Sequence, residues 1–260
     1  INLGDMDAAQ LASAVRESDL DTPVVVLAYD NNERKQFVAR RSTSEIERIF
    51  LWQGNPRILV AITKYIEDKR NVEHDTKTVG VPVILLVEDN VRYYSSFLPT
   101  IYTELFEQSE SLLSEAVNLS HKLVRMRARP KILLASTFEE AWDLFREYKP
   151  YMLGLISDVD FPRGGQPRRE AGLELARMVR AALPDLPILL QCSRGEFAGG
   201  GREVGATFLR KYSNTLLADL RRFMVENFAF GDFIFRTPDG EEVGRASDLK
   251  GLEELLHVVP

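Results

Sequence analysis

Four acidic residues follow two apolar runs of the sequence and could do chemistry together. Glu88 and Asp89 come after one run, and Asp158 and Asp160 come after another. If the two runs form neighbouring parallel strands, their carboxyl ends meet at one edge of a sheet and bring the carboxylates close together. Like charges this close raise a pKa unless a hard cation lies among them. Mg²⁺ meets that need because it prefers oxygen ligands, and the acids are therefore predicted to bind it.

Three further side chains are expected at the same edge. Lys211 follows the last apolar run, and its ammonium group is predicted to reach the acids. Cys192 and Ser193 close the run before it. A thiol is a poorer hydrogen-bond donor than a hydroxyl, and either residue could face the acids.

The elements that must position these residues alternate along the chain. Apolar runs without polar alternation are typical of parallel strands buried on both faces. These runs are Val24–Ala28, Ile49–Trp52, Val83–Val87, Lys131–Ala135, Met152–Ile156, Ile188–Cys192 and Thr207–Arg210. The amphipathic stretches between them include Asp7–Glu17, Phe138–Tyr148, Glu170–Ala182 and Asn214–Asn227. This alternation predicts an α/β fold with a doubly wound parallel sheet, whose ligands bind at the carboxyl ends of the strands.

An internal repeat indicates how the chain is organised. Residues 8–16 align without a gap on residues 172–180, and the register continues to Pro23 and Pro187, each of which opens an apolar run. We therefore expect a partial unit over residues 1–75 that lacks the opening strands, and a complete unit over residues 80–228. Residues 229–260 are predicted to form a hairpin and helix extension. The polar segment Val72–Gly80 is predicted to link the two units.

The second unit resembles the receiver domain of bacterial response regulators, also called CheY-like. Residues 84–90 resemble the opening strand and acidic pair of that family, and Asp158 with Pro162 resembles its phosphoacceptor motif. Residues 187–190 resemble the fourth strand, and residues 205–211 resemble the fifth strand with its lysine. The resemblance implies a flavodoxin-like five-stranded sheet of order 2-1-3-4-5. It also identifies the chain with two-component phosphorelay signal transduction, as a tandem of a partial, degenerate receiver and a complete one.

The resemblance assigns roles to individual residues. Asp158 would accept a phosphoryl group from a sensor histidine kinase or a phosphotransfer protein. The Mg²⁺ would be held by Glu88, Asp89, Asp158 and the backbone carbonyl of Asp160. The remaining roles are charge neutralisation by Lys211, a hydrogen bond from Cys192 or Ser193, and an aromatic switch at Phe208. The resemblance implies no enzymatic activity beyond self-phosphorylation and autodephosphorylation.

The sequence departs from the family pattern at three places. Cys192 stands where a threonine or serine is expected, and Tyr212 replaces the usual proline after the lysine. The loop after Asp158 is about six residues longer than in the first unit, and its inserted segment around residues 163–169 is basic. These departures keep open an alternative function, that of a pseudo-receiver scaffold which associates proteins without phosphate chemistry.

The first unit lacks the corresponding site residues. Ala28 and Tyr29 stand at the positions of Cys192 and Ser193, and no lysine follows Ile49–Trp52. The first unit is therefore predicted to be a degenerate receiver used for docking.

Bulk composition excludes several classes of protein. A net charge of −6 without a basic stripe argues against direct binding of nucleic acid. No apolar run approaches the roughly 20 residues needed to span a bilayer, which argues against a membrane protein. The single cysteine fits a reducing compartment, and we expect a cytoplasmic protein.

A near-heptad apolar stripe predicts an extended first helix in the second unit, over residues 91–128. Its members are Ile101, Leu105, Leu112, Ala116, Leu119, Leu123 and Met126. Two interpretations stay open, a homodimer through this stripe and packing of the stripe within the chain.

Overall fold

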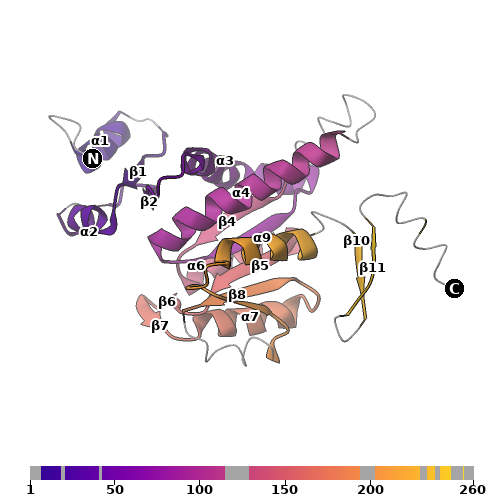
Figure 1. Ribbon diagram of the computed structural model, residues 1–260. Helices are drawn as coiled ribbons and strands as arrows, with labels where there is room; N and C mark the ends of the chain where they lie inside the picture. Colours follow the sequence, from indigo (N-terminus) through magenta and orange to yellow (C-terminus); the bar gives the residue numbers. More distant parts are fainter. Residues whose placement is uncertain are drawn as a thin grey trace.

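The computed structural model of the chain describes residues 7–18, 21–40, 43–114, 129–193, 203–228, 233–237, 241–246 and 254. Its main sheet has five parallel strands in the order β4-β3-β5-β8-β9 (Figure 1). The strands are β3 (Val83–Val87), β4 (Lys131–Ala135), β5 (Met152–Asp158), β8 (Ile188–Cys192) and β9 (Thr207–Arg210). In order along the chain this is 2-1-3-4-5, which confirms the predicted flavodoxin-like α/β fold.

Helices cover both faces of the main sheet. One face packs against α6 (Phe138–Tyr148) and α7 (Ala171–Ala182), with the short 3₁₀ helix η1 (Lys149–Tyr151) after α6. The other face packs against α4 (Val91–Ser114) and α9 (Leu216–Asn227). Every residue of β3, β4 and β8 is buried, because both faces of these strands are covered. This explains why the strands read as nearly continuous apolar runs, in which Lys131 and Gln191 are the polar members.

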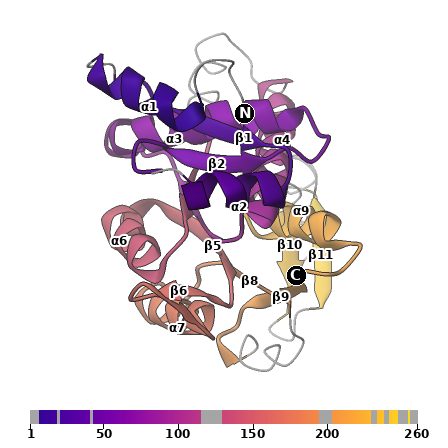
Figure 2. The same cartoon turned by 90° about the vertical axis from the view of Figure 1, so that its left-hand side faces the viewer.

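The first unit contributes a separate sheet of two parallel strands, β1 (Val25–Ala28) and β2 (Arg48–Leu51). Its helices are α1 (Ala8–Glu17), α2 (Asn31–Arg40) and α3 (Arg57–Val79). In Figure 2 this unit lies across the top of the main domain, with α2 on the side that faces the viewer. Its Phe50, Ile58 and Tyr65 belong to the same apolar cluster as the α4 face of the main sheet. Strand β2, helix α3 and the main sheet therefore share one apolar cluster.

The predicted linker is helical. Helix α3 continues through Val79 and ends at Gly80, whose φ of 73° is in the left-handed region that glycine tolerates. The helix packs along both α4 and β4. Buried Asp68 anchors it, since this carboxylate accepts hydrogen bonds from the Tyr102 hydroxyl at 2.8 Å and from the Ile132 N–H at 3.0 Å. Polarity of residues 72–80 reflects one exposed helix face and not an irregular connection.

Helix α4 begins as the sequence predicts, at Val91, and is described to Ser114. Ile101 and Leu105 of the apolar stripe are buried against the main sheet and α3. This part of the stripe therefore packs within the chain. Residues 115–128 of the predicted helix lie outside the described residues.

Two hairpins complete the described structure. Strands β6 (Phe161–Arg163) and β7 (Gln166–Arg168) pair antiparallel within the loop after Asp158, where the sequence predicts an insertion. Strands β10 (Phe233–Arg236) and β11 (Glu242–Ala246) pair antiparallel in the C-terminal extension. The helix predicted after them lies outside the described residues, apart from residue 254. Among the helices that are described, none is long and apolar enough to cross a membrane.

Candidate functional site

Three of the predicted acids lie together at the carboxyl edge of the main sheet. Strands β3 and β5 are hydrogen-bonded neighbours, with Val87 opposite Ser157 in the register. Glu88, Asp89 and Asp158 follow or end these strands, and each offers an oxygen that lies within 4.8 Å of the others. Glu88 is fully buried, Asp158 is 7% exposed, and Asp89 is exposed at the opening. The adjacency of the two strands is what assembles the cluster.

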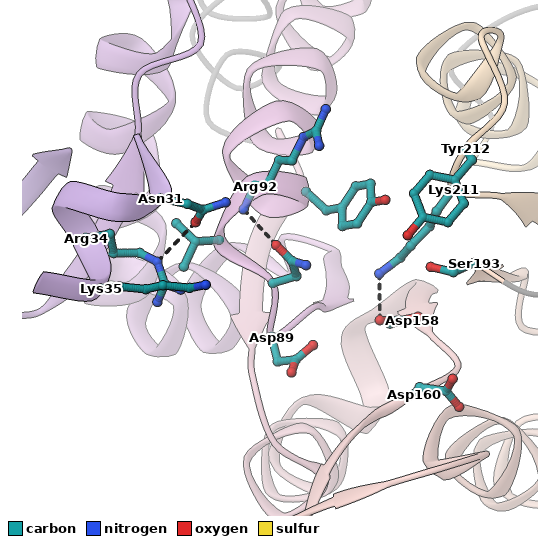
Figure 3. Close-up of a pocket in the computed structure, with 13 residues that line it drawn as sticks. Asn31, Arg34, Lys35, Asp89, Arg92, Asp158, Asp160, Ser193, Lys211 and Tyr212 are labelled. Atoms are coloured by element: carbon teal, nitrogen blue, oxygen red, sulfur yellow. Dashed lines mark hydrogen bonds and ion pairs between the residues drawn. The ribbon is translucent and has the colours of Figure 1, made fainter. Parts of the chain in front are cut away.

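Lys211 extends from the end of β9 into this cluster. Its Nζ lies 2.6 Å from Asp158 Oδ2 (Figure 3). The same atom lies 2.6 Å from Glu88 Oε2. The ammonium also lies 4.4 Å from the ring centre of Tyr93, in cation–π geometry. The Lys211 N–H donates to the Cys192 carbonyl at 3.0 Å, which continues the β8–β9 pairing. Backbone pairing thus fixes the position of the Lys211 main chain, and two carboxylates fix the position of its ammonium group.

Burial dominates the protonation of the acids. It raises the pKa of Glu88 to about 8 despite the nearby Lys211, and it also raises the pKa of Asp158. Although Asp89 is exposed at the opening, partial desolvation of its carboxyl group beside the cluster raises its pKa, and repulsion from Asp158 raises it further. Burial acts to lower the pKa of Lys211, but Glu88 and Asp158 outweigh it and the pKa is raised. The lysine is therefore charged, and the carboxyl groups are costly to ionise in the absence of a further cation.

The cluster fits a divalent metal ion. When ionised, the three acids carry three negative charges against one positive charge on Lys211. Glu88 Oε1 accepts from the Asn90 N–H at 3.1 Å. Glu88 Oε2 is buried and ion-paired with Lys211, yet it lacks a partner in hydrogen-bond geometry among the described residues. A hard cation with oxygen preference, such as Mg²⁺, would balance the excess charge and use that oxygen.

The Asp158 carboxylate is held from two directions. Oδ2 accepts from Lys211, and Oδ1 accepts from the Val159 N–H at 2.7 Å. Gly172, in the first turn of α7, packs against the same backbone. A Cβ at this position would lie 2.0 Å from the Asp158 carbonyl oxygen. Sequence reasoning missed this requirement for glycine, because the approach is visible only in three dimensions.

Ser193 and Cys192 occupy different environments. Ser193 is exposed and lines the cavity above the acids. Cys192 is 1% exposed and packs into the apolar cluster on the α6 and α7 face. Alternation of side chains along β8 separates them. The structure therefore brings the serine, and not the thiol, to the cavity. The predicted switch residue Phe208 is half-buried against the same apolar cluster.

A cavity of about 620 Å³ opens above the cluster (Figure 3). Asp89, Asp158, Asp160 and Lys211 line it, and Tyr93 and Tyr212 lie on its wall. The Asp160 side chain also accepts from the Glu170 N–H at 3.1 Å. The remaining lining residues include cations that sequence reasoning missed, namely Arg34, Lys35 and Arg92. No spacing in the sequence signals them, since α2 reaches the site only through the packing of the first unit.

Solved structures that resemble this chain include response regulator receiver domains. A receiver domain protein from Clostridium thermocellum is 18% identical, with a TM-score of 0.39, and the match covers 57% of this chain and 95% of that one. The non-phosphorylated HemR receiver domain from Leptospira biflexa is 23% identical, with a TM-score of 0.37 and coverage of 57% and 94%. The Mn²⁺-bound form of response regulator Rcp1 is 14% identical, with a TM-score of 0.34 and coverage of 55% and 91%.

No protein-family model and no curated protein sequence matches the chain. What bears on the function of this flavodoxin-like fold is the set of residues at the carboxyl edge of its sheet.

Proposed function

We propose that this chain receives a phosphoryl group on Asp158 in two-component signal transduction. The observation that carries the proposal is the position of Lys211, 2.6 Å from both Asp158 and Glu88 in a buried acidic cluster. A carboxylate and a cation so placed can accept a phosphoryl group and neutralise the charge that it brings. Phosphoryl transfer depends mainly on such positioning and electrostatic stabilisation.

Glu88, Asp89, Asp158 and the backbone carbonyl of Asp160 would hold Mg²⁺. When bound, this ion supplies charge neutralisation and an oxygen-binding position beside the acceptor. The chain itself orients the acceptor through the Val159 N–H and Lys211. Ser193 lines the cavity and offers a hydroxyl donor to the phosphoryl group.

The donor would be a sensor histidine kinase or a phosphotransfer protein in the cytoplasm. The first unit would act in docking, because its strand β2 and helix α3 pack on α4, which begins beside the acidic pair. Phe208 would link the site to the outer surface as an aromatic switch. A homodimer would use the apolar stripe beyond the part that packs within the chain.

The test is phosphorylation by acetyl phosphate in the presence of Mg²⁺, followed by intact mass measurement. Wild type is expected to gain one phosphoryl group, and Asp158→Asn is expected to gain none. Asp185→Asn, at an exposed position away from the cavity, is the matched control. A wild-type protein that binds Mg²⁺ and gains no mass would contradict phosphate reception and favour the pseudo-receiver scaffold.

A further inference from the structure

One wall of the cavity above Asp158 comes from the first unit. Arg34 and Lys35 of α2 line this wall, and Arg92 of α4 lies beside them (Figure 3). These three residues form the cationic rim of the cavity. In Figure 3 Arg34 and Lys35 lie on the side of the cavity away from Lys211, with Arg92 between them and Lys211. The side chain of Lys35 extends toward the side where Asp89 lies.

The cationic rim forms no direct ion pair with a carboxylate of the described residues. The Arg34 Nε donates to the neutral Asn31 side chain at 3.3 Å. Within the described part of the chain, no ion pair joins Arg34, Lys35 or Arg92 to a carboxylate. Three positive charges at the mouth of one cavity repel one another, so the free protein bears a cost that an anion would relieve.

The charges of the cavity favour a ligand with more than one negative charge. When all four are ionised, the acids Glu88, Asp89, Asp158 and Asp160 carry four negative charges, equal in number to the four positive charges of the cationic rim and Lys211. A divalent cation among the acids then leaves two positive charges in excess. The cations lie in two places, at Lys211 and at the rim, so the complementary ligand is anionic at two ends.

Resting on the proposed function, we infer that the cavity binds a small phosphodonor that carries a second anionic group. The transferable phosphoryl group lies at Asp158 and Lys211, and the cationic rim binds the second anion. A cavity of about 620 Å³ is in the range of small-molecule sites. The first unit thereby takes part in donor selection.

An acyl phosphate donor would transfer its phosphoryl group to Asp158 in one displacement step. A bond forms between a carboxylate oxygen of Asp158 and phosphorus. The bond between phosphorus and the acyl oxygen of the donor breaks, and the departing carboxylate keeps the electron pair. Neither side requires a proton, an oxidant or a reductant.

The test uses unreactive probes of the two-ended ligand. Alkane bisphosphonates with a phosphonate at each end are titrated calorimetrically into the whole chain at saturating Mg²⁺, beside alkyl monophosphonates of the same length. Wild type is expected to bind the best-fitting bisphosphonate about tenfold or more tightly than its monophosphonate, as a charge-assisted bond implies. The double variant R34A/K35A is expected to lose this preference and to keep its affinity for the monophosphonate.

Arg40→Ala is the matched control, because Arg40 is an exposed cation of the same helix outside the cavity lining. It is expected to keep the preference for two anionic ends. Equal affinity of wild type for both probes at every chain length would overturn the inference, and so would an unchanged preference in R34A/K35A.

Acetyl phosphate separates this inference from the proposed function, since it has no second anionic group. Wild type and Arg40→Ala are both expected to be phosphorylated by acetyl phosphate. If wild type is phosphorylated at Asp158 but shows no bisphosphonate preference, the cationic rim has no role in donor binding and the proposed function stands. If wild type gains no phosphoryl group, the proposed function fails by itself.

Discussion

The strand pairs β1–β2 and β8–β9 have the same parallel hydrogen-bond pairing, but different residues follow them. In one pair Ala28 lies opposite Leu51, and the next N–H, from Trp52, donates to the Ala28 carbonyl at 2.8 Å. In the other pair Cys192 lies opposite Arg210, and the Lys211 N–H donates to the Cys192 carbonyl at 3.0 Å. Trp52 therefore stands where the second unit has Lys211.

The side chains at these two strand ends make different contacts. Trp52 packs against the apolar cluster of the α4 face. The following Gln53 donates to the Arg92 carbonyl at 2.8 Å and accepts from the Ser96 hydroxyl at 2.9 Å. The end of β2 thus attaches the first unit to α4, whereas the end of β9 completes an acidic site. The two strand ends have the same backbone pairing, and their side chains decide whether the end packs against a helix or completes an acidic cluster.

The strongest test of this contrast is removal of Lys211. Lys211→Ala is expected to slow phosphorylation by acetyl phosphate about 10²–10³-fold, because one preorganised positive charge beside the acceptor is lost. Lys211→Arg, which keeps the charge, is expected to retain more activity. Adding Trp52→Lys to the alanine variant should restore nothing. Wild-type rates in Lys211→Ala, measured by intact mass against time, would remove the lysine from the site.

Attachment of the first unit can be broken at Asp68. Asp68→Ala leaves the Tyr102 hydroxyl and the Ile132 N–H buried without their acceptor. We expect it to lower the free energy of unfolding by about 3 kcal/mol, measured by urea denaturation. Glu67→Ala removes a neighbouring exposed carboxylate and is expected to cost less than about 1 kcal/mol. Equal effects of the two substitutions would contradict an anchoring role for Asp68.

The acidic site is expected to make the stability of the protein depend on pH. The first unit has no equivalent site among its described residues. The pKa of Glu88 is raised from 4.5 to about 8 in the folded chain, so its protonated form is favoured by folding. In Mg²⁺-free buffer this contribution to stability is fully present below about pH 4.5 and is lost as pH rises through about 8. Thermal unfolding without metal should therefore show declining stability across this window.

Mg²⁺ binding should strengthen over the same window, by up to about tenfold per pH unit, because the ion displaces a proton. Calorimetry in buffers of different ionisation enthalpy measures the proton release. Glu88→Gln is expected to flatten much of the dependence. A flat profile in wild type would show that Glu88 is already ionised before the metal binds.

The smallest expected effects distinguish Ser193 from Cys192. Ser193→Ala is expected to lower the steady-state phosphorylated fraction about fivefold at limiting donor, the worth of one hydrogen bond. Cys192→Ala should leave that fraction unchanged and lower the free energy of unfolding by about 1 kcal/mol, since the thiol is packed in the core. The reverse pattern would place the thiol at the phosphoryl group.

The sequence by itself determined the strands and the acids at their ends. Burial on both faces favours nearly continuous apolar residues, so β3, β4, β5 and β8 could be located to within a residue or two. Strand β9, which is exposed at both ends, was located as closely. Parallel connection through helices then places the carboxyl ends at one edge, which brings Glu88, Asp89, Asp158 and Lys211 together. The tandem arrangement and its domain limits stay predictions.

Tertiary structure alone decided the remaining features of the site. Polar composition could not distinguish an exposed helix face from a linker, so the continuity of α3 through Val79 was not predicted. Spacing could not choose between Cys192 and Ser193, because the choice depends on the face toward which the end of β8 turns. Arg34 and Lys35 reach the cavity only because the first unit packs on α4. Packing between units brings together residues that are distant in the chain, and no local pattern records that contact.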